Sequence, residues 1–209
     1  LVLVNMDQPG VRVRPIQLIS GDSPFAETFF EDASAAKDDL IGPINQGWNV
    51  GKRLLQYERS VHGGVNTSGA HADSKTHSLA DLARQYLGTS PDGMRLGDAH
   101  FRQRLTSLEM NAQAYALTQR RVLAETHNNA PSLATSILKV KGAEFTKERA
   151  EVLQQAMGSR GFGWEATGFT DSEIEANRDW LTTRAVSIYG GTSEIQKNII
   201  AKRVLGLPD

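Results

Sequence analysis

The stretch YGGTSEIQKNIIAKR, residues 189–203, is the part of the sequence that decides the predicted fold. Its glycine pair, Gly190 and Gly191, lets the backbone turn sharply, because glycine adopts positive φ values at little steric cost. Thr192 or Ser193 then caps a new helix, and the backbone N–H groups at a helix start can receive an anion. We therefore predict a tight turn followed by a basic amphipathic helix at the end of the chain.

Composition narrows the class of protein. The 209 residues carry 23 basic and 24 acidic side chains, a balance that argues against a nucleic-acid partner or a polybasic membrane contact. No window holds ~18 consecutive apolar residues, so we expect no membrane span. The absence of cysteine excludes disulfides, thiolate catalysis and cysteine-ligated metals, and it fits a cytoplasmic protein. The five histidines lack a metal-ligand spacing, so no metal site is predicted.

The first part of the chain is predicted to form strands. Leu1–Val4 and Val11–Ile19 are short and rich in Val and Ile, and Gln8-Pro9-Gly10 forms a turn between them. Thr28–Phe30 is a candidate third strand. Because the chain begins with a leucine inside the first of these strands, we expect it to be part of a longer protein.

Helical periodicity dominates from about Asn45 onward. A first helix extends to a stop at Gly63-Gly64, and the polar residues 65–97 are predicted to form a long loop with one short helix near Leu79–Leu87. Two long helices follow, the first ending near Asn128-Asn129 and the second running from Pro131-Ser132 to Gly158. Each has one apolar stripe at spacings of three and four: Phe101, Leu105, Leu108, Ala112, Tyr115 and Val122 in the first, and Ala134, Leu138, Phe145, Val152 and Ala156 in the second.

A glycine-rich bend at 158–163 precedes a shorter helix near Asp171–Ser187 and then the terminal helix. Helices with short connections and single apolar stripes pack as antiparallel bundles. The predicted fold is therefore mainly α, an antiparallel helix bundle preceded by a short β region.

Three blocks of sequence, in order, resemble the acyl-CoA dehydrogenase family over nearly the whole chain. The first comprises residues 29–32 (FFED), 39–42 (DLIG) and 46–48 (QGW), and the second is the bend at 155–162 (QAMGSRGF). The third is the tail at 189–203. The resemblance implies that residues 1–42 are the end of the family's middle β-domain and that residues 43–209 are its C-terminal helical domain. It also implies FAD as cofactor and an acyl-CoA thioester as substrate, oxidised at Cα–Cβ as in β-oxidation of fatty acids.

The resemblance also indicates a catalytic base. Many members of the family carry a Glu directly after the Tyr of the tail, but this sequence has Gly190 there. A second arrangement, as in isovaleryl- and long-chain-type members, places the base in a Glu-Arg pair on the first C-terminal helix, and here Glu58-Arg59 stands at that position. Glu58 is the expected base, with its pKa raised in a site closed to water. The alternative is a solvated Glu in a helix-surface pair.

Other site residues follow from the same resemblance. Arg59, Tyr189 and Gly190 are expected near the acyl-CoA. The resemblance implies contacts to FAD from four residues: Gln155, Ser159, Thr192 and Glu194. The first two are compatible with contact either within the chain or from a neighbouring subunit. Arg84, in a distant echo of the family's Arg-x-x-Phe-Gly element, is a candidate clamp for the FAD pyrophosphate. Ser159 departs from the family by replacing the second glycine of the bend.

The sequence is compatible with three functions. The first is an FAD-dependent acyl-CoA dehydrogenase that passes electrons to an acceptor of the electron-transfer flavoprotein type. The second is a relative with oxidase or monooxygenase chemistry, and the third is a non-catalytic helical subunit kept for assembly. The resemblance implies a homo-oligomer, a dimer or a tetramer. Residues 1–209 alone are expected to be inactive and colourless, because much of the flavin pocket would lie outside them.

Overall fold

The computed structural model describes residues 1–64, 78–126, 134–165 and 167–208; for residues 56–64 and 126 it describes only the helical backbone. The chain divides into two compact units, Leu1–His62 and Gly63–Asp209. The sequence placed a domain boundary between residues 42 and 43, and that boundary stays a prediction. Among the described residues, no helix is both long enough and apolar enough to cross a membrane.

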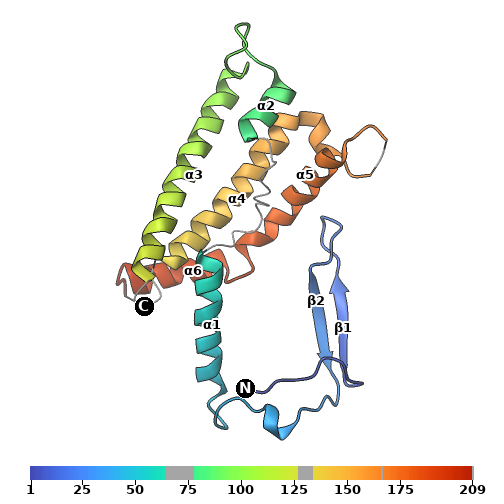
Figure 1. Cartoon of the computed structure of the whole chain (residues 1–209), viewed down its shortest axis with the longest axis vertical. Coiled ribbons are helices and arrows are strands. Elements are labelled where there is room, and N and C mark those ends of the chain that lie inside the picture. The colour runs from blue at the N-terminus through green and yellow to red at the C-terminus, as the bar shows by residue number, and fades with distance from the viewer. Residues whose placement is uncertain (65–77, 127–133, 166, 209) are drawn as a thin grey trace. The chain divides into compact units, whose positions relative to one another are not determined.

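A two-stranded antiparallel sheet opens the first unit (Figure 1). β1 (Val11–Ile16) pairs with β2 (Phe25–Phe30), so that Arg14 lies opposite Glu27 and donates a hydrogen bond from Nε to its carboxylate at 2.7 Å. The predicted strand Val11–Ile19 is therefore too long. The strand ends at residue 16, because the chain then turns. The N–H of Leu18 donates to the carbonyl of Asp22 at 2.8 Å and closes this turn.

The predicted strand at Leu1–Val4 is wrong. This segment makes only an isolated antiparallel bridge, between Val2 and Leu40, with backbone hydrogen bonds to residues 39 and 41. The partner of β1 is instead β2, which starts three residues earlier than the predicted strand at 28–30. The short helix η1 (Lys37–Asp39) and then α1 (Gly47–Gly64) complete this region, and α1 ends at the predicted glycine pair.

The second unit is a helical bundle built around one central helix (Figure 1). α4 (Thr135–Met157) packs against α3 (Ala99–Thr126), against α2 (Leu79–Leu87) and against α5 (Asp171–Thr182). It also contacts η3 (Thr183–Ser187) and α6 (Ser193–Ile199), which a turn of π-helix follows at Ile200–Val204. This arrangement confirms the predicted antiparallel bundle.

The core of the bundle lies between α2, α3 and α4. It is formed by the first half of the α3 stripe, by the end of the α4 stripe, and by residues of α2 and the loop after it: Leu79, Ala83, Leu96, Phe101, Leu105, Leu108, Val152 and Ala156. The short helix predicted inside the polar segment 65–97 is confirmed at Leu79–Leu87, where Ser78 caps it by accepting from the N–H of Asp81 at 3.1 Å. Residues 65–77, and the predicted helix limits near 128–129 and 131–132, lie outside the described residues.

A buried carboxylate fixes the glycine-rich bend to α5. The bend forms the 3-10 helix η2 (Gly158–Phe162), and Arg160 donates to Glu173 twice, at 2.8 Å from Nε and at 2.7 Å from Nη2. Glu173 also accepts from the hydroxyl of Tyr86 at 3.2 Å and from the backbone N–H of Thr170 at 2.8 Å. The side chain of Glu173 is only 4% exposed, so these donors replace its water.

The hydrogen bonds to Glu173 change its titration. Arg160, followed by the N–H of Thr170, lowers the pKa of Glu173 to about 2. Thr170 in turn caps α5 through its hydroxyl, which accepts from the N–H of Glu173 at 3.3 Å and closes a capping box. One carboxylate thus connects α2, the bend and the start of α5.

We expect the core at α3 to tolerate truncation poorly. Leu108 is 2% exposed and Leu117, nine residues further along α3, is 63% exposed. Replacing Leu108 by Ala should lower the free energy of unfolding by about 2–5 kcal/mol, because the substitution leaves a cavity. Leu117→Ala is the matched control and should cost far less in urea unfolding. Equal losses in the two variants would contradict this packing.

The lowered pKa of Glu173 predicts a specific acid sensitivity. An unfolded Glu titrates near ~4.3, so the stabilisation from ionised Glu173 is complete above that pH and is lost as the pH falls towards the folded pKa of about 2. Glu173→Gln should therefore lower the thermal midpoint at pH 6 and flatten its fall between about pH 4.3 and 2. Glu175→Gln, at an exposed position on the same helix, is the control. An unchanged acid slope in Glu173→Gln would refute the assignment.

Candidate functional site

The tail adopts the predicted turn and cap. Gly190 and Gly191 have φ values of +66° and +91°, in the region that side chains of L-residues rarely adopt. Thr192 is the N-cap of α6, and its hydroxyl accepts from the N–H of Ile195 at 3.3 Å. Of the two residues that the sequence allowed as the cap, the structure therefore selects Thr192.

A buried glutamine holds the glycine turn closed. The side chain of Gln196 is buried, and its Nε2 donates to the carbonyl of Gly190 at 3.3 Å. A Cβ atom at Gly191 would lie 2.5 Å from that Nε2, so a side chain there would displace the end of Gln196, and the φ of +91° disfavours it as well. At Gly190 a Cβ atom would meet Cε of Lys139 alone, at 3.8 Å, so the limit at Gly190 is its backbone conformation rather than space.

Thr192 and Glu194 come together at the start of α6. The pKa of Glu194 is lowered, first by its own backbone N–H and then by the hydroxyl of Thr192, with Lys197 and Lys139 adding positive charge. Tyr189 is half-exposed, and partial burial raises the pKa of its phenol. The turn therefore presents a hydroxyl, a carboxylate that stays ionised and an accessible phenol ring on one short stretch of chain.

Lys139 is a residue of this region that the sequence reasoning missed. It lies on α4, half-buried, and its ammonium donates to the carbonyl of Val186 in η3 at 2.9 Å. Burial lowers the pKa of Lys139, and the nearby carboxylate of Glu194 offsets part of that lowering. Nothing in the local sequence distinguishes Lys139 from Lys141 and Lys147 of the same helix, because the segment that it contacts is 47 residues away.

Gln155 and Ser159 lie at the other end of α4. Both are exposed, and Gln155 accepts a hydrogen bond from Arg104 of α3. Gly158 caps α4 with a φ of +56°, whereas Ser159 continues into the 3-10 helix η2. Because a 3-10 helix needs no positive φ, the backbone does not require glycine at residue 159.

The predicted cofactor residues thus form two groups. Lys139, which touches the tail, and Gln155, in the bend region, are sixteen residues apart on one helix, which separates them by about 24 Å at 1.5 Å per residue. Thr192 and Glu194 belong to the first group, and Gln155 and Ser159 belong to the second. Within one chain, the structure does not bring the two groups together.

Three predicted residues lie on α1 and α2. Arg84 lies on α2 and forms an ion pair with Asp81 at 2.7 Å, so its guanidinium already has an anionic partner. Glu58 and Arg59 lie on α1 in the first unit, and their side chains are outside the described residues.

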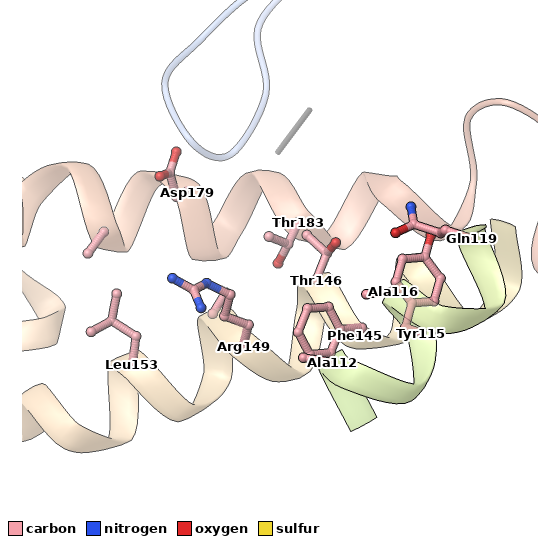
Figure 2. Close-up of a pocket in the computed structure, with 12 residues that line it drawn as sticks. Ala112, Tyr115, Ala116, Gln119, Phe145, Thr146, Arg149, Leu153, Asp179 and Thr183 are labelled. Atoms are coloured by element: carbon pink, nitrogen blue, oxygen red, sulfur yellow. The ribbon is translucent and has the colours of Figure 1, made fainter. Parts of the chain in front are cut away.

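A cavity of about 320 Å³ opens between α3, α4 and α5 (Figure 2). Arg149 and Leu153 rise from α4 towards this space, and Tyr115 and Thr183 border it. Alanines leave the room for it: Ala112 and Ala116 on α3, Ala150 on α4 and Ala176 on α5. No predicted site residue whose side chain the structure describes lines it. The sequence reasoning did not find this cavity, although an alanine pair four residues apart on a packed helix is a signal for such space.

Comparison with known proteins gives one consistent result. Residues 45–205 match the family described as "Acyl-CoA dehydrogenase, C-terminal domain". The chain is 36% identical over 212 residues to acyl-CoA dehydrogenase IpdE1 of Mycolicibacterium smegmatis, a match that covers 99% of this chain and 48% of the relative. The chain thus spans about half the length of that relative.

Solved structures share the fold. The ChsE4-ChsE5 complex from Mycobacterium tuberculosis has a TM-score of 0.77 at 22% identity, with all of this chain and 53% of the other covered. The Tcur3481-Tcur3483 steroid ACAD has a TM-score of 0.78 at 20% identity, with 99% and 51% covered. Both neighbours are complexes. With its tail turn, its bend and its bundle in the predicted order, and with the family model matching residues 45–205, this chain belongs to the acyl-CoA dehydrogenase family.

Proposed function

We propose that the protein containing this chain is an FAD-dependent acyl-CoA dehydrogenase that introduces a double bond between Cα and Cβ of an acyl-CoA thioester. The observation that carries the proposal is the glycine turn at 190–191 with its Thr192 cap, in a chain of this family. The turn offers a hydroxyl and backbone N–H groups, which suit contact with a polar or anionic cofactor. Bound FAD would accept the hydride from Cβ.

Glu58 is the proposed catalytic base. It would remove the proton from Cα of the thioester, and Arg59 would line the same acyl site. The conformation of Gly190 supports this choice over a base in the tail. A φ of +66° disfavours any L-residue, so a Glu at position 190 would strain the turn that Gln196 holds. Tyr189 and Gly190 would border the thioester, where the absence of a side chain at residue 190 leaves room.

The cofactor is proposed to be shared between subunits. Thr192 and Glu194 lie near one end of α4, and Gln155 and Ser159 lie near the other, about 24 Å away by the helical rise. Both groups could contact the same flavin if one subunit supplied the first group and a second subunit supplied the other. This separation supports an oligomer, and we propose a homo-oligomer that passes its electrons to an acceptor of the electron-transfer flavoprotein type.

Substitution of Glu58 tests the proposed chemistry. In the full-length protein, Glu58→Gln should reduce the rate at which acyl-CoA bleaches the flavin by about 10²–10⁴-fold, the usual contribution of a general base. Acyl-CoA binding should stay nearly unchanged. A panel of straight-chain, branched and steroid-derived thioesters would supply the substrate class. If Glu58→Gln bleaches at the wild-type rate with every thioester that the wild type oxidises, Glu58 is not the base.

A second substitution separates the two possible positions of the base. Adding Gly190→Glu to Glu58→Gln should not restore bleaching, because position 190 has a left-handed backbone. Gly190→Ala alone controls for the strain that any side chain introduces. Restored activity in the double variant would show that the turn accepts a base and that the backbone argument is wrong.

The identity of the electron acceptor distinguishes a dehydrogenase from an oxidase. A dehydrogenase should reduce a flavoprotein-type or artificial acceptor much faster than it produces hydrogen peroxide in air. We expect peroxide to account for a small fraction of turnovers, measured by coupled peroxidase assay in parallel with dye reduction. Stoichiometric peroxide would assign the protein to the oxidase branch.

A further inference from the structure

A half-buried lysine connects α4 to the segment before the tail. The ammonium of Lys139 donates to the carbonyl of Val186 at 2.9 Å, near the end of η3. The backbone then turns, with the N–H groups of Ile188 and Tyr189 both bonded to the carbonyl of Ala185 at 2.9 and 3.2 Å. Lys139 therefore contacts the chain three residues before Tyr189, where the direction of the turn is set.

The same side chain also lies under the glycine turn. Its Cε is the nearest described atom to the position that a Cβ would take at Gly190, at 3.8 Å. Its charge acts on Glu194, since it contributes to the lowered pKa of that carboxyl. Lys139 thus forms a hydrogen bond just before the turn and lies beside the first glycine of the turn. It also acts electrostatically on Glu194 in the first turn of α6.

Burial of a cation requires compensation. Loss of water lowers the pKa of Lys139, and the neighbouring charge of Lys147 lowers it further. The carbonyl of Val186 and the carboxylate of Glu194 supply the opposing interactions. The core of the bundle lies among α2, α3 and the C-terminal part of α4, and Lys139 does not belong to it. Lys139 instead contacts the segment before the tail, through Val186, and lies beside Gly190.

We propose that Lys139 is a positioning residue for the tail, which fixes the turn at Tyr189–Thr192 against α4 and places positive charge beneath Gly190 and Glu194. The turn contributes its own hydrogen bonds, through Gln196 and Thr192, but these close it internally and do not attach it to α4. Lys139 adds a charged hydrogen bond to the packing of α4 against η3 and α6. The structural part of this inference stands by itself, and its consequence for FAD rests on the proposed function.

The experiment compares four variants of the full-length protein. Lys139→Met removes charge and donor, Lys139→Gln keeps a donor that is too short to reach Val186, and Lys139→Arg keeps the charge. Lys141→Met is the matched control, because Lys141 is exposed on the same helix and pairs with Glu144 at 2.8 Å. Amide hydrogen exchange is measured by mass spectrometry for peptides covering residues 186–196 and, as internal reference, residues 79–87 and 158–163. The FAD dissociation constant is measured in parallel by flavin fluorescence.

We expect Lys139→Met and Lys139→Gln to accelerate exchange in residues 186–196 by about tenfold, the effect of losing one charge-assisted hydrogen bond, with the reference peptides unchanged. Lys139→Arg should recover most of the protection, and Lys141→Met should behave as wild type. If Lys139→Met does not fold, Lys139→Gln carries the comparison. Unchanged exchange at 186–196, or an acceleration spread equally over all peptides, would overturn the proposal.

The flavin measurement separates the two claims. Weaker FAD binding in Lys139→Met, restored in Lys139→Arg, would support both the positioning role and the proposed cofactor contacts of Thr192 and Glu194. Faster exchange at 186–196 with an unchanged FAD dissociation constant would leave the positioning role intact and would count against those cofactor contacts.

Discussion

The helical unit depends on one buried carboxylate. Glu173 accepts hydrogen bonds from Arg160 of the bend, from Tyr86 of α2 and from the N–H of Thr170, so three separate segments meet at a single charge. An ionised group that is almost fully buried is stable only when its donors are in place. This requirement fixes where the chain turns after α4 and how α5 returns along it. The exposed bend and its neighbour Gln155 take their positions from that constraint.

α4 gives the unit its second constraint. It contacts every other helix of the bundle, and its two ends carry different parts of the predicted site. The glycine turn of the tail lies beside Lys139, near the N-terminal end, and the bend follows the C-terminal end. A helix of this length keeps the two apart, and this separation supports the proposal that a flavin site is shared between chains.

The helices were predictable because their apolar residues recur with helical spacing and because glycine and threonine mark their ends. Gly158 stops α4, Thr192 caps α6, and the short helix at Leu79–Leu87 lies where the spacing put it. The strands were harder, since short Val-rich runs do not identify their partners. Leu1–Val4 was expected to be a strand, but it makes only a bridge to Leu40, while β1 pairs with β2. Pairing depends on contacts distant in sequence, which periodicity does not encode.

By itself, the sequence determined the family, the helical bundle and the candidate residues of the tail and the bend, because these follow from local spacing, from caps and from the order of three motifs. Only the tertiary structure decided that Arg84 is paired with Asp81, that Glu173 is the buried charge at the bend and that Lys139 lies under Gly190. Glu173 accepts from Tyr86, which is 87 residues away, and Lys139 and Gly190 are likewise distant in sequence. Such contacts arise from how helices pack, and packing is a property of the folded chain rather than of any single segment.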